Sequence, residues 1–325
     1  MTATNTDTAR AKIRISKLQV RFEVPGIESK KIYANGRMQV RVWVFVEAVD
    51  RETGSAVQLP FYPSLVTTRL IRYHDGKPLR GDVYANQPMP GWTSCTSPNE
   101  FVHEMPGAVL PPSTGGSDSG SMMEFWVSSA EEGQLQIAAE ITCDGQVYRS
   151  NKTANPDGSK LNSSVIVVAE RSPAYSHEEF TWRSEEVRGA FNGYTLFRYH
   201  LGLYPGRRQV KLLSWDTAQY EGSGQFPLRF CYTGLILSHP APRSFTGIMA
   251  PVGSQSIDVL GFQLPVKQGD GEIVAFMAIP PDYKHTGVDV RLDNYFFTVL
   301  DEYGNTHKLS LIIDIQATEF LLRRG

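Results

Sequence analysis

Residues 36–50, GRMQVRVWVFVEAVD, carry an apolar side chain at every even position from Met38 to Ala48. Successive side chains of a β-strand point to opposite faces, so this stretch predicts a strand with one face in a core. The odd positions are mostly polar or charged, but Trp43 and Phe45 lie among them. A strand with large apolar side chains on both faces needs a cover on each. What covers these two aromatic side chains is therefore the main question that the sequence raises.

The same alternation recurs along the whole chain, in residues 18–24, 135–143, 195–203, 295–299 and 309–315. Asp144-Gly145 is a favoured two-residue hairpin turn, because glycine adopts positive φ without steric cost. Residues 303–305, Tyr-Gly-Asn, predict a second, longer hairpin near the end of the chain.

Two local irregularities are also expected. Ile13 and Ile15 fall on the opposite parity to Leu18, which predicts a β-bulge near Ser16–Lys17. Residues 176–187, SHEEFTWRSEEV, are compatible with a short helix, and no longer amphipathic helix is evident. Short strands separated by turns, without intervening helices, are typical of antiparallel sandwiches.

We therefore predict an all-β protein made of two antiparallel β-sandwich domains, immunoglobulin-like or jelly-roll-like. The length of 325 residues suits two domains of roughly 150 residues each. The proline-containing polar stretch 171–180 is the expected boundary. The predicted organisation is a disordered polar tail over 1–11, an N-terminal sandwich over 12–172 and a C-terminal sandwich over 173–325.

Composition narrows the function classes. The formal net charge is -2, so no large basic field is expected to attract nucleic acid. Cys95, Cys143 and Cys231 are scattered and odd in number, which favours a reduced cytoplasmic origin over a disulfide framework. No apolar run is long enough for a transmembrane segment, and the polar start lacks a cleavable secretory signal. We expect cytoplasmic synthesis, then incorporation into a released particle or export by a non-classical route.

No motif predicts catalysis, a metal site or a cofactor. In GGSDSGS, residues 115–121, Gly116 and Gly120 flank Asp118, so the spacing of a nucleophile elbow is absent. None of the seven histidines are paired at metal-ligand spacing. NPDGS at 155–159 and GDGE at 269–272 are interpreted as turns. The expected catalytic residues, metal ligands and cofactors are therefore none, and we expect no enzyme.

The sequence leaves three arrangements possible for the side chains of Trp43 and Phe45. They are covered by the loop 51–66 with Phe61 and Tyr62, they pack on another domain or subunit, or they are exposed as a platform for sugar or lipid. Trp126 and Trp182 are candidates for sealing the domain junction, and Trp92 lies in the expected loop 85–101. The low-complexity segment 106–121 is a further expected contact loop. The candidate interface residues are Trp43, Phe45, Phe61, Tyr62, Trp92, Trp126 and Trp182.

These observations favour a non-enzymatic binding or assembly protein, for example a structural or accessory component of a bacterial phage- or tailocin-like particle. Its expected partner is another protein or further copies of the same chain, with a surface glycan as a further candidate. One alternative is a lectin or insecticidal-type toxin that binds glycans or membranes. The other is a hydrolase on a β-scaffold, which requires carboxylates distant in sequence to converge in a cleft.

Overall fold

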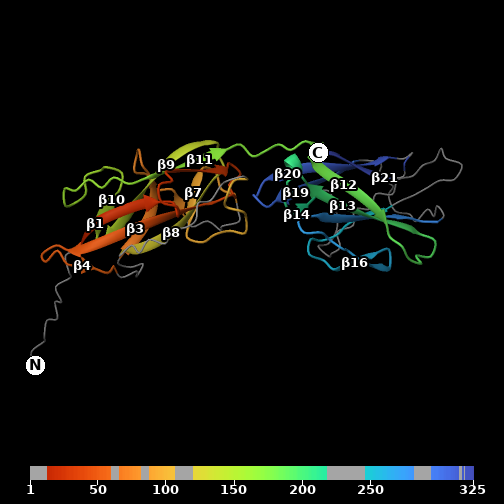
Figure 1. Cartoon of the computed structure of the whole chain (residues 1–325), viewed down its shortest axis with the longest axis horizontal. Helices are drawn as coiled ribbons and strands as arrows, with labels where there is room; N and C mark the ends of the chain where they lie inside the picture. The colour runs from red at the N-terminus through yellow and green to blue at the C-terminus, as the bar shows by residue number, and fades with distance from the viewer. Residues whose placement is uncertain are drawn as a thin grey trace, which may run out of the picture. The chain divides into compact units, whose positions relative to one another are not determined.

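A computed structural model describes residues 13–59, 66–81, 88–106, 120–217, 246–281, 294–314, 317 and 319–325. The chain forms two compact units, Met1–Ser172 and Pro173–Gly325, divided within the polar stretch 171–180. Both units are built from strands, and the described residues contain no α-helix (Figure 1). The prediction of an all-β protein is confirmed. No helix among the described residues has the length and apolarity needed to cross a membrane.

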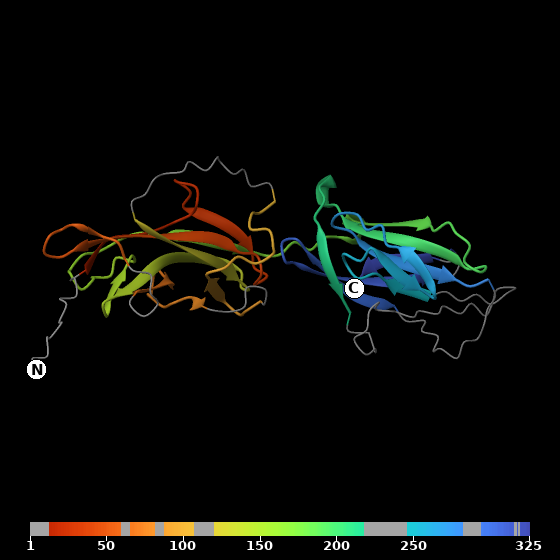
Figure 2. The ribbon, with the colours of Figure 1, turned by 90° about the horizontal axis from the view of Figure 1, so that it is seen from below.

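The first unit contains two sheets. One has the order β1 (Ile13–Arg21), β3 (Val40–Asp50), β8 (Ser121–Ser129), β7 (Trp92–Cys95) and β6 (Arg80–Gly81), with β4 (Ala56–Val57) also paired to β3. The other has the order β10 (Gln146–Arg149), β9 (Gly133–Cys143), β11 (Val165–Glu170) and β2 (Ser29–Tyr33), with β5 (Val66–Arg72) also paired to β9. The two sheets pack face to face, with β1 against β9 (Figure 2).

Local sequence signals account for much of this unit. The even positions of β3 are buried in the core, with Val42 and Val44 fully inaccessible. The β1–β3 register shifts between Ile15 and Lys17, which confirms the expected bulge. Asp144 and Gly145 both have positive φ and join β9 to β10, which confirms the two-residue hairpin.

The sheets of the first unit are mixed, whereas antiparallel pairing alone was expected. β11 pairs with β2 in parallel, and so do β6 and β7. In the sequence, most of the first unit lies between β2 and β11. A connection of this length allows the second strand to run in the same direction as the first. Alternation within each strand carries no information about that direction.

The described residues of the second unit form two four-stranded sheets and a hairpin. The first sheet has the order β12 (Phe180–Glu186), β13 (Thr195–Leu203), β18 (Ile273–Ile279) and β15 (Thr246–Met249). The second has the order β14 (Leu212–Asp216), β19 (Tyr295–Asp301), β20 (Thr306–Asp314) and β21 (Glu319–Arg324). The hairpin joins β16 (Ser256–Val259) to β17 (Phe262–Pro265).

Residues 176–187, which the sequence left compatible with a short helix, do not form an α-helix. A 3-10 turn covers only His177–Glu179, and Phe180–Glu186 then forms β12 against β13. This segment forms a strand because it pairs with the long, buried strand β13. Such tertiary contacts override a weak local preference for helix. The expected turn at residues 303–305 joins β19 to β20 and is confirmed, with Gly304 at positive φ.

The sheet containing β13 and β18 is covered on both faces. On one face, Tyr199 contacts Phe320 of β21, with ring centroids 6.0 Å apart. On the other face, Leu196, Val274 and Phe276 form a buried cluster with residues of the β16–β17 hairpin. In the view of Figure 1, β16 lies below β13 while β19–β21 lie above it. The second unit is therefore built in three layers.

Candidate functional site

The outward side of β3 forms a continuous face with its two neighbours in the sheet. Trp43 lies opposite Arg21 of β1 and Glu124 of β8, and Phe45 lies opposite Gln19 and Met122. Arg41 lies opposite Trp126. We call this surface the Trp43 face, which comprises Gln19, Arg21, Arg41, Trp43, Phe45, Met122, Glu124 and Trp126.

Arginine side chains lie against the aromatic rings of the Trp43 face. The guanidinium carbon of Arg21 is 3.8 Å from the centre of the Phe45 ring and 5.9 Å from that of Trp43. The guanidinium carbon of Arg41 is 5.3 Å from the centre of Trp43 and 5.6 Å from that of Trp126. These distances are those of cation–π contacts. The arginines cover apolar rings while keeping their charge at the surface.

Exposure varies across this face. Phe45 and Trp126 are buried, at 6% and 7% of their maximum exposure, and Trp43 is half-buried. Met122, beside Phe45, is 48% exposed. The Trp43 face is therefore a partly covered surface with an accessible edge at Met122.

Polar groups on the face are only partly satisfied. The indole Nε1 of Trp126 donates a hydrogen bond to Glu124, at 2.8 Å. The indole Nε1 of Trp43 is buried and has no acceptor among the described residues. His103 packs on Trp126 with ring centres 4.4 Å apart, and burial lowers the pKa of its imidazole. The burial of the Trp43 indole N–H is therefore not offset by a hydrogen bond from the described residues.

The sequence-based candidates separate into groups. The structure brings Trp43, Phe45 and Trp126 together on one face. Phe61 and Tyr62, the expected cover, lie outside the described residues, as does most of the segment 106–121. The described cover consists of Arg21 and Arg41, which the sequence analysis did not select. The sequence signal that could have predicted this cover is the position of the arginines, whose side chains share the outward face of the sheet with Trp43 and Phe45.

The described contacts of two other tryptophans each lie within one unit. Trp92 belongs to strand β7, paired with Ser129, and not to a loop. The short run 92–95 is a strand because it pairs with the end of β8, which its own pattern does not reveal. Trp182 stacks on Tyr199 and donates a hydrogen bond to the carbonyl of Phe320, all within the second unit. Trp126 likewise has its described contacts within the first unit.

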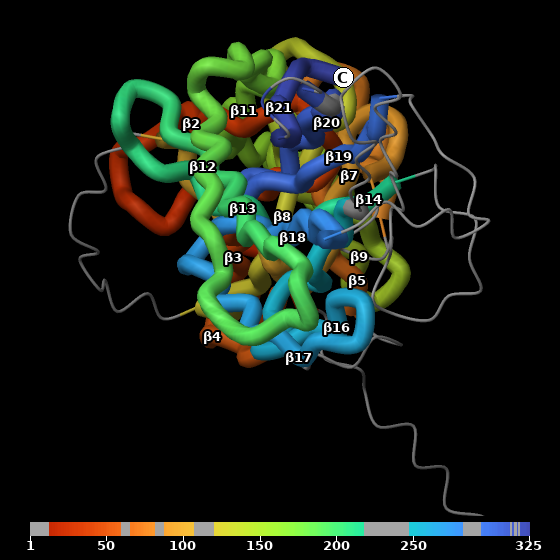
Figure 3. Tube along the Cα trace, turned by 90° about the vertical axis from the view of Figure 1, so that its right-hand side faces the viewer, coloured from red at the N-terminus to blue at the C-terminus, as the bar shows by residue number. Residues whose placement is uncertain are grey.

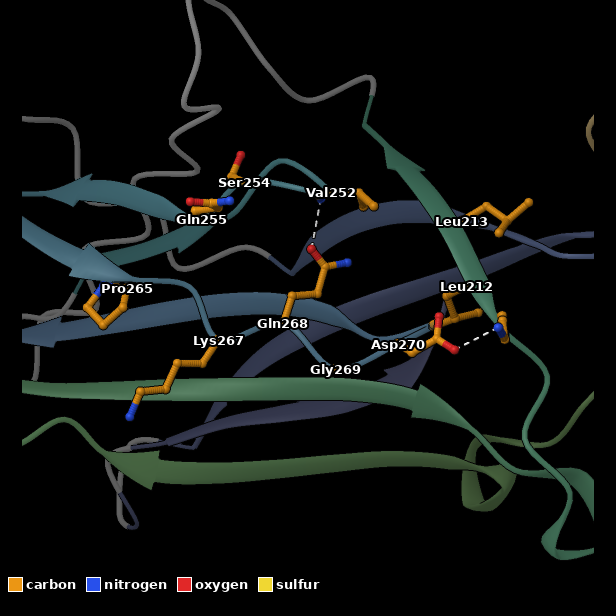
Figure 4. Close-up of a pocket in the computed structure, with 13 residues that line it drawn as sticks. Leu212, Leu213, Val252, Ser254, Gln255, Pro265, Lys267, Gln268, Gly269 and Asp270 are labelled. Carbon is orange, nitrogen blue, oxygen red and sulfur yellow. Dashed lines mark hydrogen bonds and ion pairs between the residues drawn. The ribbon is translucent and has the colours of Figure 1, made fainter.

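The second unit carries a cavity of about 750 Å³ beside the start of β14 (Figure 4). Its wall includes Leu213, Val252 and the turn 265–271, and Lys211 pairs with Asp270 across 2.6 Å. Gln268 accepts a hydrogen bond from the backbone N–H of Gly253. The segment 269–272 is a turn, as expected. In the described part of the chain, no group of His, Cys, Asp or Glu side chains is arranged to hold a metal ion.

Comparisons with known proteins add little to this geometry. No family model matches the chain, and no curated protein matches it either. Among solved structures, domains 5-6 of the S-layer protein SbsC align over 92% of this chain and 98% of that chain. The sequence identity is 9% and the TM-score is 0.20, a likeness that carries no argument about fold or function.

Proposed function

We propose that this chain is a non-enzymatic binding or assembly protein and that its partner contacts the Trp43 face. The supporting observation is the grouping of Trp43, Arg21 and Arg41 with exposed Met122 on one rigid sheet. Tryptophan, arginine and methionine are enriched at protein interfaces, and tryptophan and arginine dominate the energetic centres of such interfaces.

Within this class, we propose a structural or accessory component of a phage- or tailocin-like particle. The balanced charge of the chain and its two β-sandwich units suit a protein that is packed among others. Its partner is then another protein of the particle or a further copy of the chain. The experiment below tests this assignment.

The glycan-platform alternative is less well supported at this site. A sugar ring binds by stacking on an open aromatic face, whereas Arg21 and Arg41 already lie against the ring of Trp43. Binding of a sugar there would compete with both cation–π contacts. A protein partner is compatible with the arginines, because arginine is enriched at protein interfaces.

Site-specific photo-crosslinking tests the proposal. A photoreactive amino acid is placed at Met122, and the full chain is exposed both to itself at high concentration and to extract of the producing cells. We expect one discrete cross-linked protein, identified by mass spectrometry. The same probe at Val147, which is 37% exposed on β10 of the other sheet, is the matched control and should give no such product.

A second substitution makes the result specific. Trp43→Ala in the Met122-probe chain should abolish the cross-linked product while the far-ultraviolet circular dichroism spectrum is retained. A product that survives Trp43→Ala, or no product from position 122, contradicts the proposed binding face. Binding to a glycan array that Trp43→Ala removes, without any protein product, supports the lectin alternative instead.

A further inference from the structure

Strand β12 is an edge strand whose outward backbone groups can be identified from its register. The backbone N–H of Tyr204 donates to the carbonyl of Glu179, and the N–H of Val187 donates to the carbonyl of Leu196. Between these bonds, β12 and β13 pair one to one. Hydrogen-bonded pairs alternate in an antiparallel ladder. The N–H and C=O groups of Trp182, Ser184 and Glu186 therefore point away from β13.

Three other edge strands, β1, β10 and β21, have side chains bound to their outward backbone groups. The hydroxyl of Ser163 bonds both the N–H and the carbonyl of Val20 on β1. The side-chain amide of Asn155 does the same for Arg149 on β10. On β21, the carbonyl of Phe320 accepts a hydrogen bond from Trp182. Such occupied groups make an edge a poor template for another strand.

In the described part of the chain, no side chain is bound to the outward backbone groups of β12. Ser184 and Glu186 have no hydrogen-bond partner for their outward backbone groups among the described residues. Arg183, Ser184, Glu185 and Glu186 are all exposed. Figure 3 shows β12 beside β13 at the margin of its unit. An accessible row of unpaired N–H and C=O groups is a template for β-strand addition.

The charges on β12 select its partner. When two copies of β12 pair antiparallel around a two-fold axis, residues whose backbone groups point outward must lie opposite residues of the same kind, so that these groups hydrogen-bond to each other. If the axis passes through Arg183, two arginines face each other, and if it passes through Glu185, two glutamates do. An axis at Ser184 instead places Arg183 of each copy opposite Glu185 of the other. Opposite charges directly across a strand pair stabilise it, and like charges destabilise it.

We propose that two copies of this chain associate through β12, antiparallel around a two-fold axis at Ser184. The hydrogen-bonded pairs are Ser184 with Ser184 and Trp182 with Glu186 of the other copy. The interface is isologous and closes at two copies, because each edge is consumed by its partner. This inference concerns a different surface from the Trp43 face and does not depend on it.

Arg183 and Glu185, which would form the charged pairs, each have side-chain atoms that their contacts given below do not use. Arg183 binds buried Glu272 through Nη2 alone, at 2.8 and 3.0 Å, and its side chain is 60% exposed. Glu185 contacts Arg198 and His200 through Oε1, and its side chain is 51% exposed. The dimer thus extends one row of charges from Glu272 and Arg183 of one copy to Glu185 and Arg198 of the other.

Ser184→Pro tests the pairing on the full chain. Proline removes the outward N–H of residue 184 and leaves the bonds between β12 and β13 in place. Ser184→Ala keeps the N–H and is the matched control. In sedimentation experiments over a concentration series, we expect wild type and Ser184→Ala to dimerise equally. Ser184→Pro should weaken association by at least about tenfold, since two hydrogen bonds at the axis are lost.

A charge exchange provides a second measurement if the proline variant folds poorly. Arg183→Glu alone and Glu185→Arg alone each place like charges opposite one another in the dimer, so each should be monomeric. Mixed together they restore both opposite-charge pairs and should form a mixed dimer. A wild-type monomer at every concentration, or a dimer unaffected by Ser184→Pro and by both charge variants, overturns the proposal. Trp43→Ala must leave this dimer intact, which separates it from the proposed function.

Discussion

The two units cover the second face of a central strand in different ways. In the first unit, the outward face of β3 is covered by the guanidinium groups of Arg21 and Arg41 stacked on aromatic rings. In the second, the corresponding face of β18 lies under the β16–β17 hairpin, and Phe276 is fully inaccessible. The first cover leaves a surface that retains charge and is partly open, whereas the second completes a core.

The strand sequences explain this difference. β18 reads IVAFMAI and has apolar residues on both faces, so it requires an apolar layer on each side. β3 alternates Arg41 with Trp43 and Phe45 on its outward face, and arginine side chains lie against these rings. A cover made of side chains can be rearranged by a partner at low cost, but a cover made of backbone and core cannot.

The largest expected effect comes from breaking the layered cover. Phe276→Ala should lower the unfolding free energy of the second unit by about 3–5 kcal/mol, because it leaves a cavity between two layers. Phe296→Ala is the control, since that side chain is 47% exposed on β19 and its loss should cost much less. Urea unfolding followed by circular dichroism measures both. Equal destabilisation by the two variants would refute the assignment of Phe276 to a buried layer.

A smaller effect is expected from the ionic cluster at the end of β18. Burial alone would raise the pKa of the Glu272 carboxyl, but the hydrogen bonds and charges of Arg183 and His200 hold that pKa below its ordinary value. The carboxylate therefore stabilises the fold above the ordinary pKa of 4.5, and this contribution is lost as the pH falls through the lowered value. Glu272→Gln should cost about 2 kcal/mol at neutral pH.

The pH series sharpens that measurement. The difference in urea midpoint between wild type and Glu272→Gln should shrink as the pH falls below 4.5, because the wild-type carboxyl becomes protonated. A difference that stays constant across this range would show that the carboxylate charge does not stabilise the second unit.

The smallest effect is expected from the side-chain cover of the first unit. A double-mutant cycle with Arg21→Met and Phe45→Leu should give a coupling of about 0.5–1 kcal/mol, the strength of a partly exposed cation–π contact. The control is the ion pair of Lys17 with Glu47 between the same strands, at 3.0 Å with both side chains exposed. Its coupling should be at the low end of about 0–1 kcal/mol. A larger coupling for the control would mean that charge, not ring stacking, stabilises this face.

Much of the fold could be predicted from local patterns. Alternation identified β3, β9 and β13, the Asp144-Gly145 turn identified a hairpin, and opposite parities located the bulge at Ser16. These signals are local because a turn and the two faces of a strand depend only on neighbouring residues. The segment 180–186 was misjudged because its strand character depends on pairing with β13.

The candidate site could be predicted only in part. Trp43 and Phe45 were identified from the sequence because they are aromatic residues at positions of β3 that are otherwise polar. The side chains that lie against them belong to Arg21 on β1 and to Arg41, two positions before Trp43. Trp92 was grouped with them through its expected loop and Trp182 through its place next to the expected domain boundary. Exposure and neighbours, which separate these residues, are properties of the folded chain.

The sequence by itself determined that this protein is all-β, where its bulge and hairpin turns lie, and which face of β3 is buried, since alternation and turn chemistry act over a few residues. The tertiary structure alone decided the parallel pairing of β2 with β11, the stacking of Arg21 on Phe45, and the unprotected edge of β12. The first two features join segments that are distant in the chain. The third depends on which backbone groups remain without a hydrogen bond after the strands have paired. Contacts of this kind follow from strand order and register, which no single segment encodes.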